Sequence, residues 1–144
     1  MGESVLPVCA PSLIERYGKP RTLADVAEFP LLHDVFSIDW AEFLHHFNVE
    51  GVNVRRGFGF SHSHLVKQAC LAGHGLALGR WPLVAEEVER GELVAPFEET
   101  LMLDDAYYVV CRRSVSDEVN IKAFAYWLLD EGELFLNQSA PSPT

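Results

Sequence analysis

The most chemically suggestive part of this sequence is a tetrapeptide that combines two hydroxyl and two imidazole side chains, Ser61-His62-Ser63-His64. An apolar stretch precedes it and a helical pattern follows it, so the pattern predicts a strand-to-helix turn. In open α/β sheets, ligands bind beyond the carboxyl ends of strands, where the first N–H groups of a helix are unpaired. We therefore predict that this turn contacts a small anion or a carboxylate. The alternative is that Ser61 or Ser63 caps the helix, as serines often do.

The patterns of metal binding and of nucleophilic catalysis are incomplete in this sequence. His62 and His64 form a His-x-His pair, but a zinc site needs at least one further ligand. His45 and His46 fall on an amphipathic helical pattern and point about 100° apart, so at most one could join them. Neither a Gly-x-Ser-x-Gly motif nor a Ser or Cys next to a recognisable base occurs. We predict no metal, no cofactor and no catalytic residue, and expect that the protein is not an enzyme.

Charge and length limit the class of protein. The chain of 144 residues has 11 Lys and Arg against 21 Asp and Glu, a net charge of −10. Nucleic-acid binding depends on Lys and Arg facing phosphates, and basic residues pair here only at Arg55-Arg56 and Arg112-Arg113. We expect no direct contact with nucleic acid or with an anionic membrane. The length allows one domain, or two small lobes that share a cleft.

The cysteines and the N-terminal residues predict a cytoplasmic protein. Cys9, Cys70 and Cys111 each lie in an apolar context, and no C-x-x-C motif occurs. We expect buried free thiols in a reducing compartment. The first residues lack the basic flank and the apolar core of a signal peptide, and no apolar run approaches the length of a membrane span.

Alternation of strand and helix patterns indicates which elements would position the tetrapeptide. In the first part of the chain, strands are predicted at residues 5–9 and 31–33. Helices are predicted from Ser12 to Tyr17, from Thr22 as N-cap with Asp25 as its capping-box acid, and from Asp39. Residues 54–60 predict a further strand, in which Gly57 and Gly59 suggest that another backbone or a ligand approaches closely.

Residues 60–97 predict a strand–helix–strand–helix–strand run. The elements expected after the tetrapeptide are a helix at residues 65–70, an apolar strand at residues 76–79, a helix from Trp81-Pro82 to Gly91, and a strand at residues 93–97. Residues 101–105 read as a connection, residues 106–111 as a strong β-strand, and Asp117 as the start of a last helix. Strands separated by helices predict an α/β fold with a parallel or mixed sheet flanked by helices.

Several of these segments resemble the effector-binding domain of LysR-type transcriptional regulators. The motifs that carry the resemblance are residues 6–11 (LPVCAP), 60–69 (FSHSHLVKQA), 72–79 (AGHGLALG), 89–94 (ERGELV) and 106–111 (AYYVVC). The Phe-Ser-His turn and the Tyr-x-Val-Cys segment most resemble the subgroup of the glycine-cleavage activator and the β-lactamase regulator. The resemblance covers nearly the whole chain.

This resemblance implies a periplasmic-binding-protein-like (type 2) fold of two lobes, with a small-molecule effector in the cleft between them. Residues 1–10 would be a hinge strand, residues 11–105 the complete second lobe, residues 106–136 the return strand and C-terminal helix of the first lobe, and residues 137–144 a disordered tail. The implied effector-binding residues are Ser61, His62, Ser63, His64, His33, Asp34 and Tyr107 or Tyr108. The implied hinge residues are Pro7, Val8 and Val109.

The resemblance also implies which parts of a full regulator this chain does not represent. A regulator of this family contacts DNA through an N-terminal helix-turn-helix, and its first lobe begins before the segment that residues 1–10 match. We therefore expect exposed apolar surface on the helix around residues 121–129, which favours self-association. The predicted function is effector sensing and oligomerisation. The alternatives are a stand-alone α/β binding or dimerisation module and a small α/β enzyme.

Overall fold

A mixed five-stranded sheet in the order β3-β2-β4-β1-β5 organises the protein. The computed structural model describes residues 2–35 and 37–138. Its strands are β1 (Gly2–Val8), β2 (Leu31–Asp34), β3 (Phe58–Phe60), β4 (Leu76–Arg80) and β5 (Leu101–Ala106). Strand β2 pairs in parallel with β3 and β4, whereas β1 is antiparallel to both β4 and β5. The predicted mixed sheet is confirmed, and its carboxyl-terminal edge collects the ends of β2, β3 and β4.

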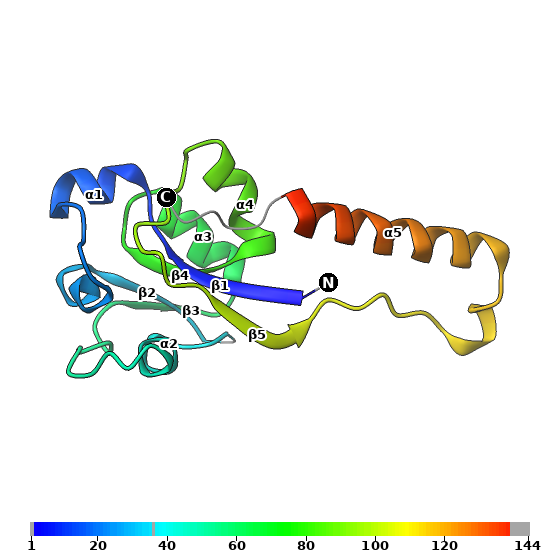
Figure 1. Ribbon diagram of the computed structural model, residues 1–144, viewed down its shortest axis with the longest axis horizontal. Helices are drawn as coiled ribbons and strands as arrows, with labels where there is room; N and C mark the ends of the chain where they lie inside the picture. The colour runs from blue at the N-terminus through cyan, green and yellow to red at the C-terminus, as the bar shows by residue number, and fades with distance from the viewer. Residues whose placement is uncertain (1, 36, 139–144) are drawn as a thin grey trace.

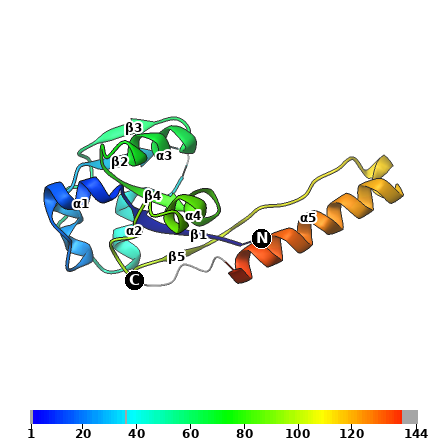
Figure 2. The ribbon, with the colours of Figure 1, turned by 90° about the horizontal axis from the view of Figure 1, so that it is seen from above.

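Helices cover both faces of the sheet, as the alternating sequence pattern predicts (Figures 1 and 2). They are α1 (Pro11–Tyr17), the 3₁₀ helix η1 (Leu23–Glu28), α2 (Trp40–His46), α3 (Ser63–Leu71), α4 (Trp81–Glu89), the 3₁₀ turn η2 (Arg113–Val115) and α5 (Val119–Gln138). Helices α1, η1 and α2 pack against one face, and α3 and α4 pack against the other.

Successive side chains of the central strands enter two different cores, because a strand alternates its side chains between the faces of a sheet. Val5 and Leu31 belong to the core beneath α1, η1 and α2, where Phe43 is fully buried. Their neighbours Leu6 and Leu32 belong to the core beneath α3 and α4. A sheet covered on both faces explains why β4 is an almost wholly apolar strand.

Two helix starts follow the capping signals predicted from the sequence. Thr22 and Asp25 form a reciprocal capping box, with the Thr22 N–H donating to Asp25 Oδ2 at 3.0 Å. Backbone N–H bonds from Arg21 and Thr22 lower the pKa of the exposed Asp25 carboxyl. Asp39 caps α2 by accepting the Glu42 N–H at 2.7 Å. These side chains satisfy N–H groups that have no partner inside the helix.

The strand predicted over residues 54–60 is wrong in its first half. Residues 54–57 form turns, and only Phe58–Phe60 pair with β2. Gly57 adopts a φ of +128°, and a Cβ there would lie 1.9 Å from the Leu31 carbonyl oxygen. The close approach of another backbone is thus confirmed at Gly57. At Gly59, a Cβ would meet only Val35 at an ordinary 3.8 Å.

The strand predicted at residues 93–97 is reduced to a single bridge. Val94 pairs with Cys9, with N–H···O bonds of 3.0 and 2.8 Å in the two directions. Pro96 follows two residues later and has no N–H to donate, so the ladder cannot continue through it. Leu93 and Phe97 are nevertheless buried in the two cores.

The order of elements predicted after residue 100 is wrong, because the strand comes first and the irregular segment follows it. Leu101–Ala106 form β5, which pairs with β1, whereas residues 107–111 have no regular secondary structure. The neighbouring strand explains this order, because a β-ladder needs a second strand to satisfy its N–H and C=O groups. Within the described residues, the β1–β5 ladder ends at the pair Gly2 and Ala106, before the β-rich residues 107–111.

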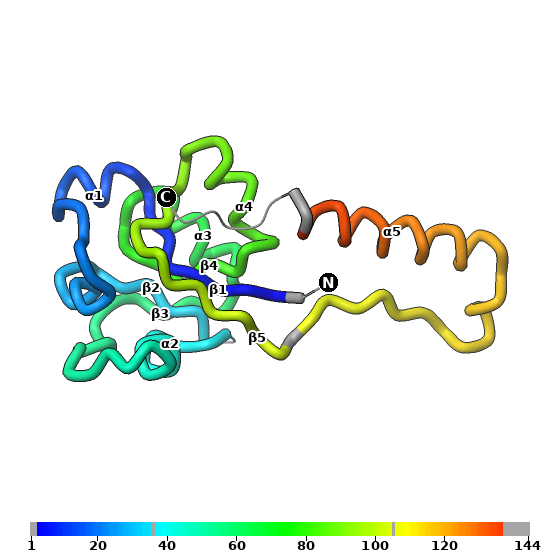
Figure 3. The backbone as a smooth tube through the Cα atoms, in the orientation of Figure 1, coloured from blue at the N-terminus to red at the C-terminus, as the bar shows by residue number. Residues whose placement is uncertain are grey.

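Residues 107–138, which we call the arm, leave the rest of the fold at the end of β5. We call residues 2–106 the body. An extended segment runs outward, η2 turns the chain, and α5 returns beside the extended segment toward the body (Figures 1 and 3). Helix α5 includes residues 137 and 138 of the predicted tail, and residues 139–144 lie outside the described residues.

Apolar side chains of the arm are exposed. Half or more of the surface of the side chains Phe124, Tyr126, Trp127 and Leu129 is accessible, which confirms the predicted apolar surface of this helix. Phe135, near the end of α5, packs against the core beneath α3 and α4. The arm therefore contacts the body at its two ends and has no core of its own among the described residues.

Candidate functional site

The carboxyl ends of β2 and β4 bring Asp34 and Arg80 to one edge of the sheet, next to the start of α3. We call this edge the rim. Both strands are buried over their apolar residues and become accessible only at their last positions. The rim is where parallel strands of an α/β sheet present ligand-binding groups. It includes part of the predicted tetrapeptide.

Ser63 is tied to the end of β2. Its hydroxyl donates a short hydrogen bond to the Asp34 carboxylate, which joins the first residue of α3 to the last residue of the strand. The N-cap of α3 is His62, and no side chain caps this position. The alternative that Ser61 or Ser63 is a simple helix cap is therefore wrong. Ser61 instead lies 2.9 Å from His62 Nδ1.

The remaining predicted residues spread around the rim. His64 is exposed on α3, and its ring centroid lies 5.5 Å from that of His62. His33 points to the opposite side of the sheet from Asp34, where its Nε2 lies 3.2 Å from the Arg56 carbonyl oxygen. Tyr108 is 79% exposed on the arm. The structure thus brings Ser63 and Asp34 together and places His33 away from both.

A second polar group at the rim surrounds the guanidinium of Arg80. Its Nη1 lies 3.3 Å from Glu3 Oε1, and its Nε donates to the Ser37 hydroxyl at 3.2 Å. Glu3 is only 3% exposed, although it is a carboxylate in a β-strand. A buried carboxylate requires a paired cation and hydrogen bonds to compensate for lost hydration. Arg80 supplies the cation from the neighbouring strand β4.

Tyr107 joins this group from the arm. Its hydroxyl donates to Glu3 Oε1 at 3.1 Å, so β1, β4 and the exit from β5 meet at one carboxylate. Burial and the negative charge of Glu3 raise the pKa of the Tyr107 phenol, and the nearby Arg80 only partly opposes this shift. The phenol is therefore held in its neutral, hydrogen-donating form.

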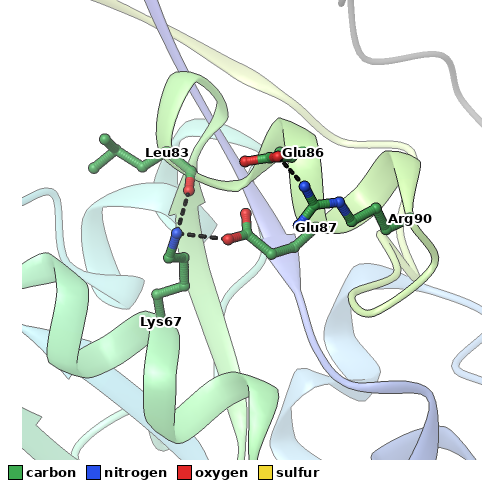
Figure 4. Close-up of polar contacts among 5 residues, drawn as sticks. All are labelled: Lys67, Leu83, Glu86, Glu87 and Arg90. Atoms are coloured by element: carbon green, nitrogen blue, oxygen red, sulfur yellow. Dashed lines mark hydrogen bonds and ion pairs between the residues drawn. The ribbon is translucent and has the colours of Figure 1, made fainter.

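A narrow recess lies beneath the rim between α3 and α4. Asp34, Ser63 and Arg80 line its mouth, and its volume of about 20 Å³ holds no more than a water molecule. Lys67 closes one side by binding Glu87 at 2.6 Å and the Leu83 carbonyl at 3.2 Å (Figure 4). Burial alone would raise the pKa of Glu87, but its hydrogen bond to Lys67 and the Lys67 charge outweigh burial and lower it.

Sequence reasoning missed Glu3, Ser37 and Arg80. They come from three separate segments, and they meet only because β1 lies between β4 and β5 in the sheet. One signal was available for Arg80, a charged residue directly after the apolar run of residues 76–79. Nothing local marks Glu3, because its burial depends on the strand order.

The predicted hinge residues occupy two different environments. Pro7 and Val8 pair with Leu78 and Ala77 of β4 in the middle of the sheet. Val109 lies in the extended part of the arm. The arm begins directly after Ala106, which pairs with Gly2. Their hinge role stays a prediction.

The thiols differ between body and arm. Cys9 and Cys70 are buried, as predicted, and burial raises the pKa of each thiol to about 12. Cys70 also donates to the Val8 carbonyl at 3.3 Å. The prediction is wrong for Cys111, which is exposed, because none of the described strands pairs with the segment around it.

Two kinds of structural feature are absent from residues 2–35 and 37–138. No group of three or more His, Cys, Asp or Glu side chains there could hold a metal ion. Within the same residues, no helix is both long enough and apolar enough to cross a membrane.

Comparison with known proteins agrees with the fold described above. Residues 1–133 match the LysR substrate binding domain. The chain is 38% identical over 127 residues to the glycine cleavage system transcriptional activator of Escherichia coli (strain K12), an alignment that covers 88% of this chain. It spans 42% of the length of that relative. The relatives are transcriptional regulators, which points to a protein that is not an enzyme.

Solved structures show the same fold. The Citrobacter freundii effector binding domain superposes with a TM-score of 0.74 at 21% identity, covering 89% of this chain and 63% of the other. The effector domain of the transcriptional regulator AmpR of Pseudomonas aeruginosa gives 0.72 at 16% identity, with 96% and 66% covered. The predicted periplasmic-binding-protein-like fold and the predicted subgroup are confirmed.

Proposed function

Because this chain belongs to the family of LysR substrate binding domains, we propose that it senses a small-molecule effector for a bacterial transcriptional regulator. The observation that carries the proposal is the meeting of Glu3, Arg80 and Tyr107 at the rim, beside the Ser63–Asp34 pair. An effector bound at the rim would contact the end of β4 and, through Glu3, the two segments by which the chain enters and leaves the body.

The effector-contacting residues of this proposal are those near the mouth of the recess. Ser63 and Asp34 present a hydroxyl and a carboxylate, and Ser61, His62 and His64 flank them on the exposed turn. Tyr107 approaches from the arm. Binding would shift the population of arrangements between the body and the arm, and this shift is the signal that a regulator passes on.

The partners proposed for this chain follow from its surface. With a net charge of −10, it would not contact DNA itself, and a helix-turn-helix elsewhere in a complete regulator would do so. The exposed apolar side chains of α5 would drive self-association. We place the protein in the cytoplasm, where such a regulator meets DNA.

A thermal-shift experiment tests the proposal. The chain is heated with amino acids, aromatic carboxylates or muropeptide fragments, and a ligand of the folded state raises the melting temperature as RT ln(1 + [L]/Kd). At 100 times Kd the gain is about 2.7 kcal/mol, a rise of several degrees for a domain of this size. Ser63→Ala serves as the variant, and Ser116→Ala, on the distant η2, serves as its matched control.

The expected result is stabilisation by one chemical class that Ser63→Ala weakens and Ser116→Ala leaves unchanged. If no class stabilises the chain, the sensing function is refuted. If the ligand stabilises both variants equally, it binds elsewhere than the rim.

A further inference from the structure

The arm is tied to the body at two places, both at its base. At its start, the Tyr107 hydroxyl donates a hydrogen bond of 3.1 Å to Glu3 Oε1 on β1. At its end, Phe135 of α5 packs against the core beneath α3 and α4. Between these points the extended segment runs outward and α5 returns (Figure 2). Contacts at the base therefore decide the direction of the whole arm.

The carboxylate of Glu3 is a fixed point of attachment. Its side chain is 3% exposed, and Arg80 Nη1 lies 3.3 Å from its Oε1. The Arg80 Nε in turn donates to the Ser37 hydroxyl at 3.2 Å. A chain of satisfied hydrogen bonds of this kind holds each side chain in one orientation. Glu3 thus presents an oxygen to the arm from a rigid part of the body.

Tyr107 connects this carboxylate to α5. The tyrosine lines a mainly apolar groove of about 250 Å³ in the arm, together with Leu128 and Leu136 of α5. Its hydroxyl meanwhile reaches Glu3 in the body. A hydroxyl that donates to a carboxylate makes one of the stronger hydrogen bonds in proteins. One side chain therefore joins the helix of the arm to the first strand of the body.

The middle of the arm has no hydrogen bond or ion pair to the body among the described residues. None of the described strands pairs with residues 107–111. On α5, Phe124 is 58% exposed and Trp127 53%, and their rings stack on each other at the surface. A helix of the length of α5 spans about 30 Å. A small rotation at the base therefore moves these two rings through a much larger distance.

We propose that the arm is a strap latched to the body by the hydrogen bond from Tyr107 to Glu3, and that Glu3 is the residue that sets its direction. While the latch is closed, the exposed rings of Phe124 and Trp127 keep one orientation relative to the sheet. When it opens, Phe135 remains as the second contact and the arm takes up several directions. The latch requires no ligand, so this inference is independent of the sensing function.

Distances between the arm and the body test the latch. The exposed Cys111 carries one spin label, and Glu42→Cys, at an exposed position of α2, carries the second. Cys9 and Cys70 are buried and stay unlabelled. Double electron–electron resonance is recorded on the full chain, diluted until sedimentation shows a monomer. We expect one narrow distribution of distances between the two labels.

Two tyrosines that follow each other in the sequence supply a variant and its matched control. Tyr107→Phe removes only the latch hydroxyl, and Tyr108→Phe makes the same change at a side chain that is 79% exposed. Tyr107→Phe should raise the population outside the narrow distribution roughly 10- to 100-fold, because a hydrogen bond to a charged group is lost. Tyr108→Phe should leave it unchanged. Adding Phe135→Ala to Tyr107→Phe should broaden the distribution further, whereas adding Leu134→Ala, at an exposed leucine, should not.

A double-mutant cycle tests whether the hydroxyl acts through Glu3. In a Glu3→Gln background, Tyr107→Phe should have a smaller effect, because the acceptor is no longer charged. An equal effect in both backgrounds overturns the role of Glu3.

Three further outcomes overturn the latch. They are an unchanged distribution in Tyr107→Phe, equal broadening in both tyrosine variants, and a distribution that is already broad in the parent protein. Urea denaturation separates a purely structural role. If Tyr107→Phe lowers the free energy of unfolding while the distances in the folded chain stay the same, the hydrogen bond stabilises the fold and does not direct the arm.

Discussion

The body and the arm are both rich in apolar residues but use them differently. In the body, Phe43 is fully buried between α2 and the sheet, whereas in the arm Phe124 is 58% exposed. Every helix of the body covers one face of the sheet, while α5 lies beside an extended segment without regular secondary structure. The comparison teaches that the buried core of this chain lies in the body, and that the arm leaves apolar side chains exposed.

Thiol reactivity should show the largest difference between the two regions. With a pKa of about 12, Cys9 and Cys70 are ionised to only about one part in 10⁴ at pH 8. The exposed Cys111 should react with iodoacetamide at least ~1000-fold faster, as measured by mass spectrometry of labelled peptides. Cys111→Ser should remove the fast phase. Comparable labelling of Cys70 would mean that the body opens readily.

Substitution of one phenylalanine in each region should give the next largest difference. Phe43→Ala should lower the free energy of unfolding by about 3–5 kcal/mol, because it leaves a cavity in a closed core. Phe124→Ala should change it by no more than about 0.5 kcal/mol, as is usual for surface positions. Urea denaturation followed by tryptophan fluorescence measures both. Equal losses would show that the arm is as well packed as the body.

Self-association should depend on the arm alone. Trp127→Glu places a charge in the exposed apolar face of α5 and should raise the dimer dissociation constant about tenfold or more, the effect expected for a central interface residue. Leu83→Glu, at an exposed leucine of the body, should leave that constant unchanged. Sedimentation equilibrium measures both variants. A dimer that only Leu83→Glu disrupts would place the interface on α4.

The smallest effect concerns two lysine ion pairs, one in each region. Lys67→Met should cost less than about 1 kcal/mol at pH 7, and Lys122→Met, whose partner Asp117 is highly exposed, about zero. The folded-state pKa of Glu87 is lowered, so the stability that Lys67 provides is present above the unfolded pKa. It is lost as the pH falls through the folded value.

Urea titrations of wild type and Lys67→Met at pH 7 and pH 3 give the difference. The difference in stability between the two proteins should be smaller at the lower pH. A difference of the same size at both pH values would mean that Lys67 acts by packing its methylene groups, and that its charge contributes nothing.

Much of the body could be predicted from local sequence signals. The caps at Thr22 and Asp39, the apolar strand β4 and the crossover helices α3 and α4 each carry their own pattern. The last strand could not be predicted in this way. Residues 107–111 have the stronger β propensity, yet the acid-containing segment Leu101–Ala106 pairs, because β1 lies next to it.

The candidate site likewise has one part that the sequence could predict and one part that it could not. Ser63 and Asp34 are close because each stands at the end of a recognisable element, and sequence reasoning could place both at one edge. The partnership of Glu3 with Arg80 depends on β1 lying between β4 and β5 and running antiparallel to both. Sequence patterns report what an element is, and strand order is decided by the packing of all elements together.

Strand β1 has a consequence for how the body could be moved between proteins. Gly2 and Ala106 are opposite each other in the β1–β5 ladder, so the chain enters and leaves the body through two adjacent strands. A segment with neighbouring ends can be inserted into a loop of a host domain without distorting either partner. The body is in this sense a transplantable cassette, and a fluorescent protein or an enzyme interrupted by it would report any change in the spacing of two strands.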